Sequence, residues 1–414
     1  MNYRSEIRDT VWLALFQGLN YIVPIILWPY LMYVLGAEGW GNFTFGLSVA
    51  QWLILIVDFG FNLTATKRIS LARGNQEEVN KIFTATLCAK LLLLAVSGLF
   101  LTGIVLVPRF AIYRRVTCVF FLMVAGSCCQ FVWLYQGLGQ IWRVSGINAV
   151  CKLLILPLVF VLVKSDADVV LAALLQSASF VACGVWVVIS IRVHGYARLC
   201  RVAWDDIREA LRDGLPVFMS SAATSVYTAL FVVILAWFAL PDEVGRYTAA
   251  EKLMRSGILL LWSPLVQAFF PRVSRLSKED RESAERLIKR LTVVSVTIAI
   301  VIGTALFVGA EPIAALLGKD YTGIAPIARV LSVVPLFVCT GGITGQLGLL
   351  AMGDEDDKRR YRNVYLTAAV VALLLVLPAA KYWQGRGVAI AVAIVEMYVC
   401  AGVGRVYFKK SNRG

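Results

Sequence analysis

The chain has 414 residues, of which 59% are hydrophobic and only 16% charged, and its mean hydropathy is +0.76. Because the apolar residues lie in long runs rather than at amphipathic spacing, this composition excludes an ordinary soluble domain and indicates a polytopic membrane protein. The net charge of +14 does not indicate a nucleic-acid partner, because the basic residues follow the loop distribution of a membrane protein.

Twelve apolar runs are long enough to cross a bilayer, since a helix needs about 20 such residues to span a hydrocarbon core of about 30 Å. They cover residues 11–35, 40–61, 83–107, 112–135, 144–163, 169–191, 215–240, 246–271, 291–309, 324–350, 364–380 and 387–407. The sequence therefore predicts an all-α membrane protein with twelve transmembrane helices.

The basic residues orient these spans. With the N-terminus inside, most of the 40 Lys and Arg residues fall in inner segments and few fall in outer loops. Basic residues gather on the cytoplasmic side of bacterial-type membranes. We therefore expect a multi-pass protein with both termini in the cytoplasm.

Two segments that lie 204 positions apart resemble each other and indicate an internal repeat. Residues 38–44 align with 242–248, and the same register places Arg68 over Arg272 and Gly41 over Gly245. An internal repeat usually means that one structural unit is used twice.

The even number of spans in each half predicts a parallel repeat. We expect an N-terminal lobe over residues 1–191 with spans one to six, and a C-terminal lobe over 215–414 with spans seven to twelve and a short cytoplasmic tail. A cytoplasmic loop with a short amphipathic helix, residues 192–214, should join them. Such repeats generally enclose a site near the midplane, so the lobes should be related by a pseudo-two-fold axis around a central cavity.

Enzymatic and metal motifs are absent from the sequence. Gly318 and Lys319 are followed by Asp320, so no Walker A loop can hold ATP phosphates, and no GxSxG or HExxH pattern occurs. The single histidine, His194, cannot build a metal site alone. We expect no cofactor, and the short outer loops argue against a membrane-embedded glycan polymerase or glycosyltransferase.

Charges inside the spans are the most informative residues, because an ionisable group there is costly and usually faces a wet cavity. At about 1.5 Å per residue, Lys152 lies roughly 12 Å and Arg255 roughly 14 Å from the nearer helix end. We expect both to line the cavity from different lobes. Lys252, Lys90 and Arg329 are further candidates, with snorkelling toward the interface as the alternative for Lys90 and Arg329.

Three acidic residues in the spans are candidates for coupling transport to a proton or sodium gradient. Glu396 is the deepest, and a buried hydrogen-bonding role is its alternative. Glu251 precedes Arg255 by four residues and could instead be its partner on the same helix. Asp58 lies near the inner end of the second span, where terminating or gating that helix is the alternative role.

Five segments resemble the Wzx-type O-antigen flippases, in the polysaccharide-transporter branch of the multidrug/oligosaccharidyl-lipid/polysaccharide (MOP) exporter superfamily. They are 58–70 (DFGFNLTATKRIS), 133–139 (WLYQGLG), 245–252 (GRYTAAEK), 270–274 (FPRVS) and 387–391 (GVAIA) followed by Glu396. The resemblance covers essentially the whole chain, in the same order and spacing.

The resemblance implies a transporter that moves undecaprenyl-pyrophosphate-linked oligosaccharide from the inner to the outer leaflet of the bacterial inner membrane by alternating access. Cationic residues would then offset the pyrophosphate charge, and Arg68 and Arg272 are candidates for a cytoplasmic gate. Expected partners are this lipid-linked substrate, membrane lipids, an O-antigen polymerase and a chain-length regulator. A multidrug or small-solute exporter of the same superfamily remains the alternative.

Overall fold

The computed structural model describes residues 3–411, with all their side chains except those of residues 3–15, 17, 20, 21, 223, 224, 226–229, 410 and 411. The described part is helical nearly throughout and contains no strand. It forms two compact units. Unit 1 comprises Met1–Leu35 and Asn42–Ser225, and unit 2 comprises Gly36–Gly41 and Val226–Gly414.

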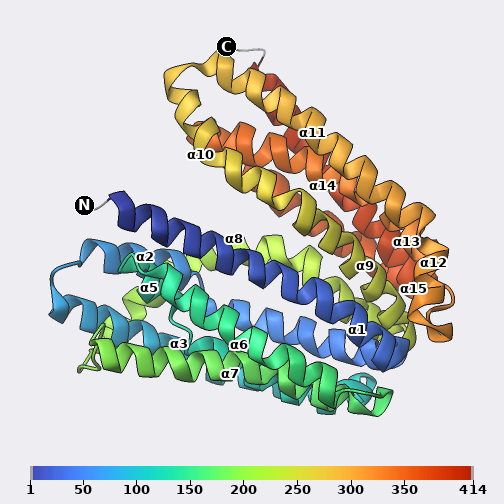
Figure 1. The fold of residues 1–414 in the computed structure, drawn as a ribbon, viewed down its shortest axis with the longest axis horizontal. Helices are drawn as coiled ribbons and strands as arrows, with labels where there is room; N and C mark the ends of the chain where they lie inside the picture. Colours follow the sequence, from blue (N-terminus) through green and yellow to red (C-terminus); the bar gives the residue numbers. More distant parts are fainter. Residues whose placement is uncertain (1–2, 412–414) are drawn as a thin grey trace. The chain divides into compact units, whose positions relative to one another are not determined.

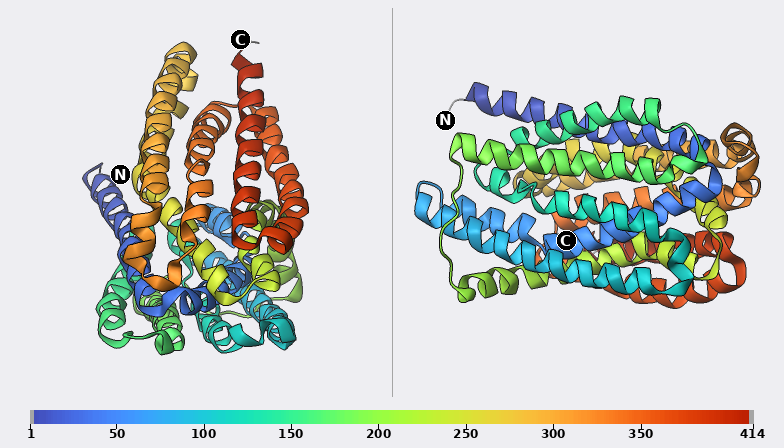
Figure 2. Two further views of the ribbon diagram at one scale, coloured as in Figure 1. Left: turned by 90° about the vertical axis from the view of Figure 1, so that its right-hand side faces the viewer. Right: turned by 90° about the horizontal axis from the view of Figure 1, so that it is seen from below.

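Unit 1 is a bundle whose long helices run side by side (Figures 1 and 2). Its elements are α1 (Tyr3–Asp58), α2 (Phe61–Leu71), α3 (Gln76–Leu106), the 3-10 turn η1 (Pro108–Tyr113), α4 (Arg114–Cys128), α5 (Val132–Gly137), α6 (Ile141–Leu162), the 3-10 turn η2 (Asp166–Asp168) and α7 (Val169–His194). Aromatic residues fill the end of the bundle at which α3 begins, where Phe83, Phe131 and Trp133 are buried in ring-to-ring contact.

Unit 2 is a second helical bundle (Figure 1). It contains α9 (Pro241–Leu261), α10 (Ser263–Glu279), α11 (Arg281–Val308), α12 (Ala310–Leu317), the 3-10 turn η3 (Lys319–Tyr321), α13 (Ile324–Leu331), α14 (Val334–Gly342), the π-helix η4 (Ile343–Ala351) and α15 (Glu355–Ser411). The helix α8 (Trp204–Phe238) begins in unit 1 and ends in unit 2.

These helices account for the twelve expected spans. Eight described helices are long and apolar enough to cross a membrane, and α9 with α10, bent by 40° at Trp262, makes a ninth. α1 and α15 each contain two expected spans, because their backbones are non-helical at Gly36 and Gln384. α8 covers the seventh span. The chain is therefore an all-α multi-pass membrane protein.

The expected joining segment, residues 192–214, is partly a connection and partly helix. The polar segment that starts at Trp204 continues without a break through Pro216 into the seventh span, as part of α8. A proline removes one hydrogen bond from a helix, but the remaining bonds can carry the helix past it. The segment from Gly195 to Ala203 is a connection without helix.

Two expected spans, 40–61 and 112–135, are interrupted near their C-terminal ends. After α1 the backbone turns left-handed at Phe59 (φ 40°) and Gly60 (φ 82°), and before α5 it does so at Phe131 (φ 42°). Left-handed backbone is strained for a side chain such as phenylalanine and unstrained for glycine. The first break lies in the family-like segment 58–70, and the second lies two residues before the segment 133–139.

The repeat appears in the packing of unit 2 as a reciprocal contact between two glycines. A Cβ added to Gly41 would lie 1.8 Å from the carbonyl oxygen of Pro241, and one added to Gly245 would lie 1.8 Å from that of Ala37. A shift of 204 positions converts one contact into the other. Only glycine permits this approach of two helix backbones.

Candidate functional site

The charges of α9 and the second half of α15 form a buried cluster in unit 2. The Nε atom of Arg255 lies 2.8 Å from Oε1 of Glu251, and the Glu251 side chain is only 3% exposed. Glu396 is 7% exposed and interacts electrostatically with both residues. Lys252 lies within electrostatic range of the same pair. We call these four residues the charged cluster.

The sequence of α9 explains how Glu251 and Arg255 come to be neighbours. Pro241 occupies the first turn, where no hydrogen bond is lost, and Asp242 and Glu243 complement the positive end of the helix dipole. The helix then places Glu251 and Arg255, four residues apart, on one face. The predicted alternative for Glu251, a partner of Arg255 on the same helix, is confirmed.

The position of Glu396 depends on a contact between residues that are far apart in the sequence. Glu243 accepts a hydrogen bond from the backbone of Gly385 at 3.2 Å and also pairs with Arg246 at 3.1 Å. Gln384, directly before Gly385, is the non-helical residue at which α15 bends. This contact joins the start of α9 to the start of the helical segment that carries Glu396.

The charge balance of the cluster bears on its chemistry. Two carboxylates and two cations are neutral together when all four are ionised. A buried charge is tolerated when it is paired and hydrogen-bonded. If Glu396 takes up a proton, the cluster gains one net positive charge, which favours an anion beside Arg255.

Lys152 lies in unit 1, in a pocket of about 140 Å³ bounded by α1, α4, α6 and α7. The polar residues Gln51, Gln176 and Ser179 also line this pocket, together with apolar side chains and no carboxylate. Lys152 itself is half-buried. This position gives a cation amide and hydroxyl neighbours inside an apolar span.

Lys90 and Asp58, assigned to different roles by the sequence, are brought together in unit 1. The Lys90 Nζ lies 2.9 Å from Oδ1 of Asp58, and the lysine side chain is 2% exposed. Asn62 donates to the other Asp58 oxygen at 3.4 Å. The ion pair lies at the end of α1, directly before the break at Phe59 and Gly60.

Two of the family-like segments pack against each other at this end of unit 1. Thr66 on α2 donates to the carbonyl of Trp133 on α5 at 3.2 Å, and the Arg73 Nε donates to the carbonyl of Gly137 at 2.7 Å. The two short helices therefore form one hydrogen-bonded structure beyond the two backbone breaks.

The remaining basic candidates lie in more exposed places. Arg68 lies 3.6 Å from Glu209 and 3.7 Å from Asp213, both on α8. Arg329 pairs with the exposed Glu311 at 2.6 Å, a surface position that fits the snorkelling alternative. Arg272 is exposed on α10, and no carboxylate pairs with it among the described residues.

An ion pair, which we call the polar tether, connects α8 to α3 at the same end of unit 1. Lys81 Nζ lies 2.9 Å from Oδ1 of Asp206. Hydrogen bonds from Lys81 and from the backbone of Ala203 hold the pKa of the Asp206 carboxyl below its ordinary value. At neutral pH Asp206 is therefore ionised, and this polar tether is intact.

The sequence analysis missed several uncharged polar residues of these sites. Gln51, Gln176 and Asn62 stand in or next to apolar spans, and an amide at such a position is a usable signal. Their neighbours could not be known from the sequence. Among the described residues, no group of three or more His, Cys, Asp and Glu side chains could hold a metal ion.

Comparison of the sequence with known proteins identifies a family. Residues 7–277 match the family described as "Polysaccharide biosynthesis protein". The chain is 29% identical over 405 residues to a protein of Escherichia coli (strain K12) named "Putative O-antigen transporter", covering 96% of this chain and 95% of that protein. A protein of the same name from Shigella dysenteriae is 30% identical over 397 residues, with 95% and 97% covered.

Solved structures with the same fold are membrane transporters. The lipid II flippase MurJ matches with a TM-score of 0.72 at 12% identity, covering 96% of this chain and 87% of that one. A multidrug resistance MATE transporter of the MOP superfamily matches with a TM-score of 0.65 at 16% identity, covering 95% and 100%. At such identities the likeness concerns the fold. The curated relatives and the fold together describe a transport protein rather than an enzyme, and the family match confirms the resemblance inferred from the motifs: the chain belongs to the family of polysaccharide biosynthesis proteins.

Proposed function

We propose that this protein is a flippase that moves undecaprenyl-pyrophosphate-linked O-antigen, or a related polysaccharide repeat unit, across the bacterial inner membrane. Full-length similarity to two proteins named as O-antigen transporters supports the substrate class. The observation that carries the proposal is the half-buried Arg255, held by the buried Glu251 and within electrostatic range of Glu396.

The charged cluster has the chemistry to bind and release a diphosphate. A guanidinium group binds a carboxylate and a phosphate with the same forked geometry, so a diphosphate can replace Glu251 as the partner of Arg255. Lys252 supplies a second cation on the next residue after Glu251. The sugar moiety would travel with this head group, while the polyprenyl tail stays in lipid.

Lys152 is proposed as a phosphate contact for a reason that does not depend on the charged cluster. It is a cation in an apolar span, in a pocket that Gln51, Gln176 and Ser179 also line. Lys90 is a weaker candidate for substrate contact, because Asp58 already neutralises it. Arg329, paired near the surface with Glu311, is the weakest of the five cations.

Ion coupling is proposed to act through Glu396 first and Glu251 second. Protonation of Glu396, or sodium binding in its place, changes the net charge beside Arg255 by one unit and so changes the affinity for the diphosphate. A site that alternately faces the two sides of the membrane would then couple the ion gradient to lipid transport. Asp58, paired with Lys90, is a third candidate.

The proposed function also assigns a cytoplasmic side to the protein and partner proteins to its transport. Both termini would lie in the cytoplasm, and Arg68 and Arg272 would act at a cytoplasmic gate, where Arg68 exchanges its partners Glu209 and Asp213. An O-antigen polymerase and a chain-length regulator would use the transported repeat units on the outer side.

Reconstituted flipping tests this function directly. Proteoliposomes that carry an undecaprenyl-pyrophosphate-linked oligosaccharide in the inner leaflet should expose it to an external glycan-cleaving enzyme, faster with a proton or sodium gradient than without. Equal flipping rates with and without these gradients would show that transport is not coupled to either ion. Export of a cationic dye without movement of the lipid-linked sugar would favour the drug-exporter alternative.

A further inference from the structure

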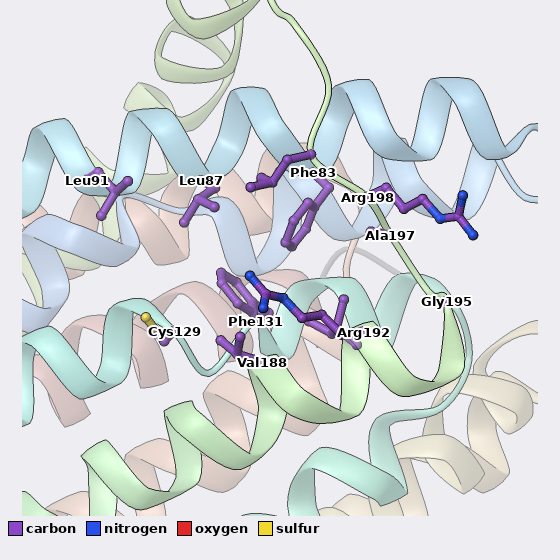
Figure 3. A pocket seen from close by; sticks show the side chains of 12 residues that line it. Phe83, Leu87, Leu91, Cys129, Phe131, Val188, Arg192, Gly195, Ala197 and Arg198 are labelled. Atoms are coloured by element: carbon purple, nitrogen blue, oxygen red, sulfur yellow. The ribbon is translucent and has the colours of Figure 1, made fainter.

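Unit 1 contains a second, larger pocket, separate from the one around Lys152. It has a volume of about 580 Å³ and lies between α3, α7, the break before α5 and the connection that follows α7 (Figure 3). Ligand pockets in proteins commonly have volumes of about 300 to 1,000 Å³. No step of the proposed transport uses this pocket.

Its walls are apolar along most of their length. Phe83, Leu87 and Leu91 stand at four-residue spacing on one face of α3, which covers roughly 12 Å of helix at 1.5 Å per residue. Phe131 and Val188 line the pocket from α5's N-terminal break and α7 (Figure 3). Leu91 is 50% exposed, so the pocket opens to the outer surface of the bundle, where the spans meet lipid.

The other end of the pocket is basic. Arg192 in the last turn of α7 and Arg198 in the following connection both line it, and no carboxylate does. Neither guanidinium is paired with a carboxylate in the part of the chain that the structure describes. In Figure 3 the Arg192 side chain points back along the pocket, whereas that of Arg198 extends away from it.

The position of this basic end matches a membrane interface. The segment that contains Arg192 and Arg198 is an inner, cytoplasmic one in the predicted orientation, and an arginine at the end of a span meets lipid head groups there. Basic pockets between helices on the cytoplasmic side are typical sites for anionic head groups. The apolar wall on α3 then runs from this interface into the hydrocarbon region.

We propose that this pocket binds one anionic phospholipid of the cytoplasmic leaflet. Its phosphate contacts Arg192, and Arg198 can turn toward the same head group. One acyl chain lies along Phe83, Leu87 and Leu91. The lining offers almost no polar side chains besides these arginines and Cys129, so it cannot satisfy sugar hydroxyl groups, and the glycan-bearing substrate is excluded as the occupant.

Native mass spectrometry of the full-length protein in detergent tests the proposal with phosphatidylglycerol and phosphatidylethanolamine as probes. Phosphatidylglycerol should bind about fivefold more tightly for each arginine that contacts it. Arg192→Gln should lower that preference about fivefold, the share of one arginine. Leu87→Trp, which fills the apolar part, should weaken binding of both lipids. Arg201→Gln is the matched control, because Arg201 is exposed on the same connection and does not line the pocket.

Three outcomes would overturn the assignment. Equal binding of the two lipids by the unchanged protein would show that the pocket does not select an anionic head group. A preference for phosphatidylglycerol that is unchanged in Arg192→Gln but falls in Arg201→Gln would place the lipid elsewhere. Displacement of phosphatidylglycerol by equimolar undecaprenyl phosphate would make the carrier lipid, not a bilayer phospholipid, the occupant. Because Arg192 is exposed, its substitution leaves the folded protein available for all of these measurements.

Discussion

At the scale of single residues, the charged cluster has one cation whose geometry matters and one acid whose protonation matters. Arg255 reaches Glu251 through its Nε atom, which leaves its terminal nitrogens for other acceptors. Glu396 influences Arg255 from a different helix. Substitutions of Arg255 therefore test hydrogen-bond geometry, and substitutions of Glu396 test charge.

Arg255→Lys should impair transport partially and Arg255→Ala about tenfold or more, because a lysine keeps the charge but cannot bind phosphate in a forked geometry. Surface glycan output in a deletion strain, normalised to membrane protein level, measures both. The double variant Glu251→Gln, Arg255→Gln is the control: it keeps the cluster's charge balance, so it should accumulate normally in the membrane and still fail to transport.

Lys152→Ala should also reduce glycan output strongly without loss of protein from the membrane. The reason is that, of the described residues, Lys152 is the one lysine or arginine lining its pocket, so its loss leaves no described cation there for an anion. Wild-type output from the Lys152→Ala, Arg255→Ala double variant would refute the cationic mechanism for both residues.

Glu396→Gln should uncouple transport from the ion gradient, because glutamine keeps the size of the side chain but cannot change its charge. Flipping rates in proteoliposomes with and without an imposed gradient provide the measurement. Full gradient-dependent transport by this variant would show that Glu396 is structural only.

At the scale of elements, close backbone contacts and breaks decide how helices meet. The glycine pair Gly41 and Gly245 permits one such contact, and the breaks at Phe59 and Phe131 permit another, because they direct α2 and α5 toward each other. A span with a regular helix throughout could not place Thr66 against Trp133 in this way.

Gly41→Ala and Gly245→Ala should each lower the melting temperature of the purified protein. The added methyl group would overlap a carbonyl oxygen at 1.8 Å, and overpacking of this kind costs about 1 to 3 kcal/mol. Gly103→Ala is the control, because Gly103 lies in α3 with nothing within 4 Å of the added atom. Melting temperatures of the first two variants at or above that of Gly103→Ala would contradict the contact.

At the scale of the whole molecule, the twelve spans and their orientation determine which side each site faces. Reporter fusions after Ser165, Asp242 and Lys381 should indicate an outer location. Fusions after Asn75, Lys278 and Lys358 should indicate an inner one, since the inner segments hold most of the basic residues. A consistent reversal would invert every inner and outer assignment, including that of the lipid pocket.

The sequence by itself determined the class, the spans and the family, because each depends on local information. The length of an apolar run is a property of the run, and the motifs from Asp58 to Glu396 are read in order along the chain. The pair of Glu251 and Arg255 was also predictable, because helical periodicity places residues four apart on one face.

Only the tertiary structure decided which distant residues meet. Lys90 pairs with Asp58 across 32 positions, so a candidate for substrate contact and a candidate for ion coupling became one ion pair. Glu396 reaches Arg255 because α15 bends at Gln384 and is held there by Glu243. Such contacts depend on how helices pack and where they break, which the periodicity of a single helix does not specify.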